Sequence, residues 1–234
     1  MESLKNKSAV ITGGGSGIGK AIAEALVNEG VNVVIASRRK DVLEETGGEL
    51  NSAGRGKAYW FECDLRNAAQ IKKLAEFAAE KLNGIDILIN NSGLGVQTKI
   101  IDCSEETWDL VMDTNLKGTF LLTREVLPYM IKNKSGYIIN IASQAAKHGY
   151  PEAGPYCASK FGLIGFSEAL QHEVREYNIH VHCLNPALVQ VPAPESDAQV
   201  RHDVLQTEDL ASTVTFLLKQ PRRIFYENIG LYRF

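Results

Sequence analysis

The sequence has few cysteines and no apolar run long enough to cross a membrane. No CxxC pair and no histidine cluster accompany the four cysteines, which are Cys63, Cys103, Cys157 and Cys183. This pattern argues against a zinc site or a disulfide framework, so we expect no metal and four free, buried thiols. The longest apolar runs, such as residues 85–89, have the length of a strand, whereas a transmembrane helix needs about 20 apolar residues.

An excess of charge of one sign is also absent. The 25 Lys and Arg residues and 28 Asp and Glu residues leave a net charge of −3. No basic stripe predicts a nucleic-acid partner, no polybasic block predicts a membrane surface, and the first residues lack the apolar stretch of a secretory signal. We therefore expect a cytoplasmic protein whose residues 1–234 form a single domain.

Short apolar runs alternate with helical patterns along the chain. The expected strands are residues 8–12, 32–36, 58–62, 85–90, 137–141 and 180–185, and the expected helices are 18–29, 68–82, 105–133, 156–177 and 208–219, with Pro128 bending or breaking the third helix. This alternation predicts an α/β fold with three layers, doubly wound around a central, mostly parallel sheet. The polar, irregular segment 191–206 follows the sixth strand and is a candidate lid over a ligand.

A glycine-rich turn follows the first expected strand. Residues 12–19 read TGGGSGIG, so Gly13, Gly17 and Gly19 are spaced as GxxxGxG before a helix. Glycine allows backbone angles that side chains forbid, and lets the backbone approach a pyrophosphate at a helix N-terminus. No GK[ST] follows, which argues against a P-loop nucleotidase.

A tyrosine and a lysine four residues apart begin a later helix. Tyr156 and Lys160 would lie on one helix face, where the ammonium is expected to lower the pKa of the phenol. Such a phenol can exchange a proton with a carbonyl oxygen. Ser143, directly after the fifth expected strand, is expected to bond the same oxygen.

These motifs together resemble those of the short-chain dehydrogenase/reductase family, in its compact single-domain branch. The resemblance implies a Rossmann fold and hydride exchange between a nicotinamide and a carbonyl or secondary alcohol, with Tyr156 as the acid/base. It also implies that Asn115 helps to hold a water-linked proton path to Lys160, and that Lys160 bonds the nicotinamide ribose. The predicted catalytic residues are therefore Asn115, Ser143, Tyr156 and Lys160.

The second expected strand ends without a carboxylate. Ser37, Arg38 and Arg39 stand there, and two guanidinium groups suit the 2′-phosphate of NADP(H). By the resemblance, residues 64–65 and 91–93 also line the cofactor. The predicted cofactor contacts are Gly13, Ser16, Gly17, Ile18, Gly19, Ser37, Arg38, Arg39, Asp64, Leu65, Asn91, Ser92, Gly93, Tyr156, Lys160, Pro186, Ala187 and Val189.

The chain departs from the family after the sixth expected strand. Ala187 stands where the family has glycine, and Val191 stands where it has the threonine that contacts the nicotinamide carboxamide. Backbone groups of Ala187 or Val189 are expected to hold the carboxamide instead. Residues 227–234 are expected to add a seventh strand.

The substrate is harder to predict than the reaction. Pocket candidates are Gln144, Ala145, His148 and Tyr150, around a small carbonyl or alcohol. One alternative is a 3-oxoacyl-carrier-protein reductase, although Pro128 and His172 occupy the positions where such enzymes carry arginine. Another is a non-catalytic NADP-binding sensor. The resemblance further implies a homodimer or homotetramer, formed through residues 105–133 and 156–177.

Overall fold

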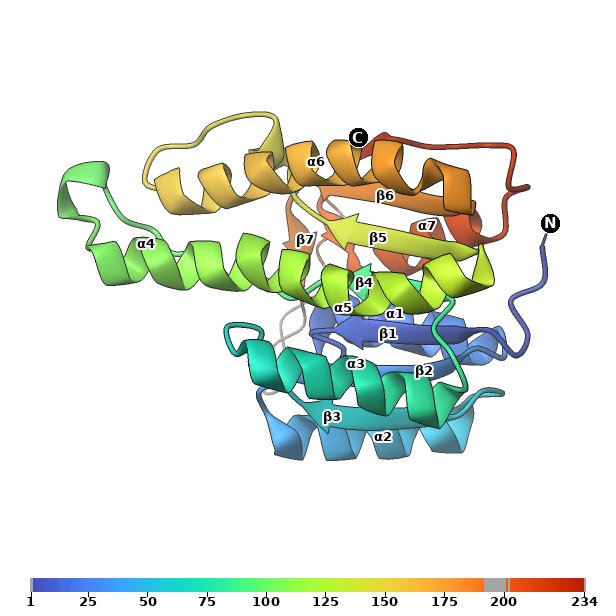
Figure 1. Cartoon of the computed structure of the whole chain (residues 1–234). Helices are drawn as coiled ribbons and strands as arrows, with labels where there is room; N and C mark the ends of the chain where they lie inside the picture. Colours follow the sequence, from blue (N-terminus) through green and yellow to red (C-terminus); the bar gives the residue numbers. More distant parts are fainter. Residues whose placement is uncertain (1, 192–200, 202, 234) are drawn as a thin grey trace.

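Seven parallel strands form the centre of the computed structural model, which describes residues 2–191, 201 and 203–233 (Figure 1). The strands are β1 (Ser8–Thr12), β2 (Asn32–Ser37), β3 (Ala58–Glu62), β4 (Ile87–Asn90), β5 (Gly136–Ile141), β6 (Ile179–Pro186) and β9 (Asn228–Leu231), in the order β3-β2-β1-β4-β5-β6-β9. Every residue of β1, β4, β5 and β6 is buried, as expected for strands covered on both faces. The predicted doubly wound α/β fold is confirmed, and the sheet is parallel throughout.

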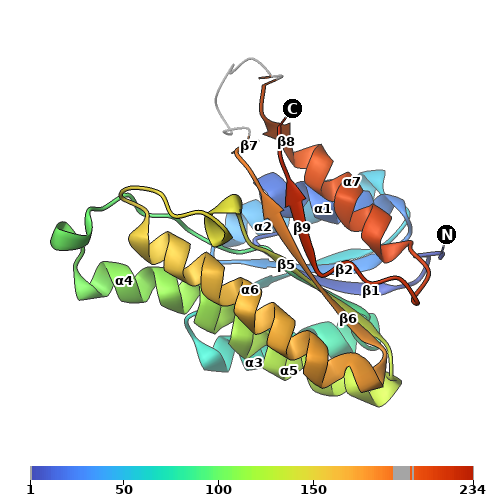
Figure 2. The same ribbon diagram turned by 90° about the horizontal axis from the view of Figure 1, so that it is seen from above.

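Helices cover both faces of the sheet (Figure 2). One layer contains α1 (Gly17–Asn28), α2 (Lys40–Ala53) and α7 (Thr207–Leu218), and the other contains α3 (Ala68–Leu82), α5 (Gly118–Asn133) and α6 (Gly154–Val174). Successive residues of β1 point to opposite layers: Ile11 packs with the α1 side and Val10 with the α3 side. The order in which strands are added to the sheet reverses between β1 and β4, so the carboxyl ends of these parallel strands border a crevice where ligands bind in such folds.

Helix α2 was not predicted from the sequence. Gly47 and Gly48 lie in its middle, and its buried side chains are few. Glycine normally weakens a helix, because it loses the most backbone freedom on folding. Gly47 is explained by packing: a Cβ there would lie 3.2 Å from Trp60 of β3, so the small residue lets the helix approach the sheet.

The helix predicted over residues 105–133 is interrupted, but not at the proline. It consists of α4 (Glu105–Met112), a π-helical turn (Asp113–Lys117) and α5, and Pro128 lies inside α5. Of the two effects expected of Pro128, a bend or a break, the break is therefore wrong. Single π-helical turns inside helices often occur at functional sites, and this one contains Asn115.

The C-terminal part of the chain adds the seventh strand and a small second sheet. The strand predicted over residues 227–234 is confirmed as β9, although it is shorter than expected. Most of the predicted lid, 191–206, lies outside the described residues. Its flanks pair as a two-stranded parallel sheet of β7 (Val189–Gln190) and β8 (Leu205–Gln206).

The cysteines are free, as predicted, but Cys103 is not buried like the other three. It follows a short 3₁₀ helix, Ile100–Asp102, on the loop that leads to α4. Within the described part of the chain, no helix is both long and apolar enough to cross a membrane.

A buried histidine in β6, next to the edge strand β9, makes the free energy of unfolding depend on pH. His182 of β6 stacks on Phe225. Its Nδ1 lies 2.6 Å from the carbonyl oxygen of Tyr226, which accepts a hydrogen bond from it. The pKa of His182 is lowered to about 4, mainly by burial and in smaller part by the nearby His180, while the hydrogen bond with Tyr226 opposes the shift. The pKa of His180 is also lowered, by burial and by Arg222.

We predict that the free energy of unfolding falls as the pH decreases from about 6.5 to about 4. In this interval the unfolded histidine binds a proton that buried His182 does not, which costs up to about 3 kcal/mol. The free energy of unfolding from urea denaturation should therefore depend less on pH in His182→Asn than in the wild type. The exposed His172→Asn is the control. Equal pH dependence in all three proteins would contradict the assignment.

Candidate active site

The turn after β1 requires glycine at three positions. Gly13 and Gly17 adopt left-handed backbone angles, with φ of +66° and +54°. Gly19 has ordinary angles, but a Cβ there would overlap with the carbonyl oxygen of Gly13. The first two glycines thus shape the turn, and the third lets α1 begin directly against it. The free N–H groups at the start of α1 consequently face the crevice.

The turn is fastened to the segment that follows β4. The hydroxyl of Thr12 accepts hydrogen bonds of 3.0 Å from the backbone N–H groups of both Asn91 and Ser92. The side-chain amide of Asn91 donates to the carbonyl oxygen of Thr12, also at 3.0 Å. These bonds hold the carboxyl ends of β1 and β4 together, although no β-ladder continues there.

A cavity of about 360 Å³, the glycine-turn cavity, opens at this edge of the sheet. It brings together most of the predicted cofactor contacts. Its walls are Gly13, Gly15, Ser16, Gly17, Ile18, Ser37, Arg38, Arg39, Cys63, Asp64, Leu65, Asn91, Ser92, Gly93, Leu94, Thr114 and Val191. Gly19 is buried beneath the turn rather than in the wall.

Positive charge lies at one end of the glycine-turn cavity. Arg38 and Arg39 are exposed where β2 ends, and Arg39 Nη2 donates to Ser16 Oγ at 3.0 Å. Asp64 lies in the same wall, where the carboxyl group interacts with Arg66 and with Arg38. The hydrogen bond from Arg66 is the main reason why the pKa of Asp64 is below its usual value.

Tyr156 and Lys160 occupy consecutive turns of α6, which begins at Gly154, two residues earlier than predicted. Lys160 Nζ lies 5.7 Å from the centroid of the Tyr156 ring and donates to the carbonyl oxygen of Ile141 at 2.8 Å. The lysine side chain is only 4% exposed, and burial lowers its pKa to about 8. A water-poor environment therefore disfavours the ammonium that accompanies the tyrosine.

The pKa of Tyr156 differs from the sequence-based expectation. Burial raises it above the usual value, and a hydrogen bond with the Ser143 side chain lowers it in part. Lys160 does not produce the lowering that we expected, because loss of hydration outweighs the other contributions. The phenol is therefore protonated at neutral pH in this structure.

Asn115 connects three segments around Lys160. Its Oδ1 accepts a hydrogen bond of 2.8 Å from the N–H of Leu94, and its Nδ2 donates to the Leu94 carbonyl at 2.8 Å and to Ser159 Oγ at 3.0 Å. The amide thus binds the loop after β4 to α6. A Cβ on Gly93 would lie 3.4 Å from both Asn115 Oδ1 and Lys160 Nζ, so this glycine lets the loop pass close to them.

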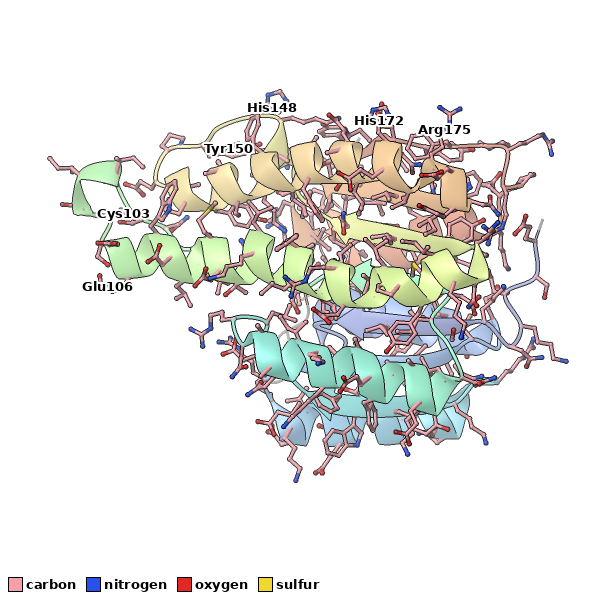
Figure 3. All side chains as sticks on the ribbon, in the orientation of Figure 1. Cys103, Glu106, His148, Tyr150, His172 and Arg175 are labelled. Atoms are coloured by element: carbon pink, nitrogen blue, oxygen red, sulfur yellow. The ribbon has the colours of Figure 1, made fainter. Side chains whose placement is uncertain are left out.

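A second cavity of about 730 Å³, the tyrosine cavity, lies beside Tyr156. Its walls are Ile18, Asn91, Gly93, Leu94, Gly95, Val96, Gln97, Ile141, Ala142, Ser143, Gln144, Ala145, Tyr150, Pro151, Ala153, Tyr156, Lys160, Pro186, Ala187, Leu188, Val189 and Val191. Three of the four predicted pocket residues are among them. The fourth, His148, is exposed and points away from the molecule (Figure 3).

The two cavities share one wall, made of Ile18, Asn91, Gly93, Leu94 and Val191. An elongated molecule could therefore extend from the arginines at the end of β2 to Tyr156. The glycines fit this use, because a Cβ on Gly13 would lie 2.8 Å from Asn91 Nδ2 and would narrow the passage. The residues present thus fit a dinucleotide with its pyrophosphate on the turn.

Comparison with known proteins agrees with this arrangement. The model of the family described as short chain dehydrogenase matches residues 7–201. The chain belongs to the short-chain dehydrogenase family. It is accordingly an oxidoreductase.

Relatives of the short-chain dehydrogenase family match nearly the whole chain. An uncharacterized oxidoreductase of Staphylococcus aureus (strain USA300) is 31% identical over 224 residues, which cover 96% of each chain. A metagenomic short-chain oxidoreductase in complex with NADP is 31% identical, with a TM-score of 0.88 and coverage of 100% of this chain and 99% of that chain. An actinorhodin polyketide ketoreductase variant with NADPH is 29% identical, with a TM-score of 0.89 and coverage of 100% and 98%.

The two departures from the family pattern lie in different surroundings, Ala187 beside the seventh strand and Val191 beside the glycine turn. The N–H of Ala187 donates to the carbonyl oxygen of Leu231 in β9 at 2.8 Å. This N–H is used within the sheet, so it cannot hold a carboxamide; of the two alternatives that we expected, Ala187 or Val189, the N–H of Ala187 is excluded. Val191 lies against the turn, since a Cβ on Gly17 would be 2.9 Å from Val191 Cγ1.

Several wall residues were not predicted from the sequence. Residues 94–97 line the tyrosine cavity directly after the predicted segment 91–93, so their position after β4 was a usable signal. Leu188 could likewise have been inferred from its neighbours. Thr114 and Ser159 had no such signal, because the π-helical turn and the partner of Asn115 become visible only in the structure.

We predict opposite effects of alanine at two helical glycines. Gly19→Ala should lower the free energy of unfolding by about 1–3 kcal/mol, because the methyl group meets the backbone of Gly13. Gly48→Ala has open space around it and should raise the same quantity by about 0.5–1 kcal/mol. Urea denaturation of the two variants measures both changes. A shift in the same direction for both would contradict the packing argument.

Proposed function

We propose that this protein is an NADP(H)-dependent oxidoreductase that interconverts a carbonyl compound and the corresponding alcohol, with Tyr156 as the acid/base. The observation that carries the proposal is the position of Tyr156. The phenol and Ser143 line one cavity, with Lys160 beside the ring, and this cavity shares a wall with the glycine-turn cavity. A proton donor and a dinucleotide site therefore meet at one edge of the sheet.

The cofactor preference follows from charge at the end of β2. Arg38 and Arg39 offer guanidinium groups to a 2′-phosphate, and β2 ends without a carboxylate that would favour NAD. The solved relatives with NADP and NADPH support the same preference. Lys160 would hold the nicotinamide ribose, and the N–H groups at the start of α1 would hold the pyrophosphate.

The proposed reduction needs one hydride and one proton. When bound, NADPH supplies the hydride to the carbonyl carbon. Ser143 and Tyr156 hold the carbonyl oxygen, and Tyr156 gives it the proton, so the product is an alcohol and the tyrosine becomes a phenolate. Tyr156 keeps its proton at neutral pH and so has one to give, although the burial that raises its pKa also makes the phenol a weaker acid. The ammonium of Lys160 then stabilises the phenolate.

Asn115 has a positioning role in this proposal. Its amide holds the loop of Leu94 against α6, and this loop forms the wall opposite Tyr156. Gln144, Ala145 and Tyr150 are proposed to contact the substrate. His148 is the weakest candidate, because its side chain is exposed rather than in the wall.

We also propose that residues 1–234 form one cytoplasmic catalytic domain that assembles as a homo-oligomer. Trp108, Phe120 and Phe161 support the assembly, because these large apolar side chains are 40–48% exposed on α4, α5 and α6. Contiguous exposed apolar surface is typical of protein–protein contacts.

A binding titration followed by a carbonyl panel tests the proposal. The protein is titrated with NADPH and NADH by fluorescence, and then mixed with ketones, aldehydes, diketones and β-keto thioesters while cofactor absorbance is followed. Selective NADPH binding and oxidation by a ketone or aldehyde support the proposal. A clear preference for the thioesters would instead favour a 3-oxoacyl-carrier-protein reductase, which the likeness to a polyketide ketoreductase makes worth testing. Binding without turnover on the whole panel would favour a sensor.

We predict that Tyr156→Phe retains the cofactor but loses turnover. The ring is kept and the transferable proton is removed, so kcat should fall by about 10²-fold or more. The dissociation constant of NADPH should change by less than about threefold. Tyr129→Phe, on α5, is the matched control with unchanged kcat. If the Tyr156 variant keeps kcat within a few-fold of the wild type, Tyr156 is not the acid.

We predict that Arg38→Asp weakens NADPH binding far more than NADH binding. The new carboxylate repels the 2′-phosphate and a charge-assisted bond is lost, which corresponds to about tenfold or more. Fluorescence titration gives both dissociation constants. Arg223→Asp makes the same change of charge before β9, at the amino end of the sheet, and should leave both constants unchanged. Equal weakening for both nucleotides would remove the assignment of Arg38.

A further inference from the structure

An ion pair stands at the edge of the glycine-turn cavity and has no part in the reaction described above. Arg66 Nε lies 3.0 and 3.1 Å from the two carboxylate oxygens of Asp64, and Arg66 Nη2 lies 2.5 Å from Oδ2. The backbone N–H of Arg66 also donates to Asp64 Oδ1, at 2.9 Å. Both oxygens of Asp64 are therefore bound by a single neighbouring residue.

The geometry of Asp64 explains why the pair forms. Gln70 Oε1 accepts a hydrogen bond of 2.8 Å from the backbone N–H of Asp64, which orients the residue at the end of β3. With the backbone held, the carboxylate faces a guanidinium fork whose spacing matches its two oxygens. Of the two residues, Asp64 belongs to the cavity wall and Arg66 does not, so Arg66 influences the cavity through Asp64.

The pair determines the charge that a bound anion would meet. Arg38, Arg39 and Asp64 share the wall, and Asp64 interacts electrostatically with Arg38. Without Arg66, the Asp64 carboxylate would repel a phosphate and would compete with it for Arg38. With Arg66, the negative charge of Asp64 is neutralised and Arg38 is left for the ligand.

We propose that Arg66 is a positioning residue that sets the preference for NADPH over NADH, by neutralising Asp64 beside the site of the 2′-phosphate. This inference rests on the proposed function, because it requires that Arg38 faces that phosphate. It adds a residue outside the cavity wall to those that select the cofactor. Its role is electrostatic, so a lysine at position 66 should preserve most of the effect.

Binding titrations of both nucleotides test the inference. In Arg66→Gln, the dissociation constant of NADPH should rise by about three- to fivefold at low salt, whereas that of NADH should change by less than about twofold. The difference should shrink as NaCl is added, because salt screens an exposed charge. Arg66→Lys should restore most of the preference. Lys72→Gln, an exposed loss of charge on α3, is the matched control.

A second substitution separates charge from structure. Adding Asp64→Asn to Arg66→Gln removes the unpaired carboxylate, so the ratio of the two dissociation constants should return toward the wild-type value. If Arg66→Gln weakens both nucleotides equally, or if the double variant does not recover the ratio, the inference is overturned. If the wild type itself shows no preference for NADPH, both the inference and the proposed cofactor are overturned. If the wild type prefers NADPH and Arg66→Gln has the same ratio of dissociation constants as the wild type, the inference is overturned but the proposed cofactor is not.

Discussion

The position of the glycine turn relative to the loop after β4 depends on the hydroxyl of Thr12. It accepts hydrogen bonds from two successive N–H groups after β4, and so fixes the turn after β1 to the loop that passes Lys160. This contact lies beyond Ile11 and Ile89, where the ladder between β1 and β4 ends, at the point where the strand order reverses. The hydroxyl of Thr12 thus sets the distance between the glycine turn and the loop of Leu94. The contacts of the Asn115 amide and the wall of the tyrosine cavity depend on this distance.

The local signals of the sequence predicted the sheet and the main motifs well. Buried strands such as β2 and β4 are mainly apolar, and the glycine spacing and the Tyr156–Lys160 pair are properties of neighbouring residues. Tertiary packing decided the rest. Packing against Trp60 explains Gly47 in helix α2, and the π-helical turn is visible only once Asn115 has its partners.

Electrostatics was the least predictable part of the site. The spacing of Tyr156 and Lys160 indicated that the ammonium would lower the pKa of the phenol. In the folded chain, loss of hydration dominates for both groups and moves the two pKa values apart, up for the tyrosine and down to about 8 for the lysine. A pattern of residues gives the pairing, but the depth of burial decides the sign of the shift.

The shared wall of the two cavities has a consequence for how such a protein can diverge. A substitution at Ile18, Gly93 or Val191 alters both cavities at once, so it cannot change the shape of one cavity without changing the other. The residues that line the tyrosine cavity alone, and not the glycine-turn cavity, include Gln144, Tyr150 and Leu188. Substitutions that alter the tyrosine cavity alone are therefore confined to one side of the crevice, whereas those in the shared wall alter both cavities.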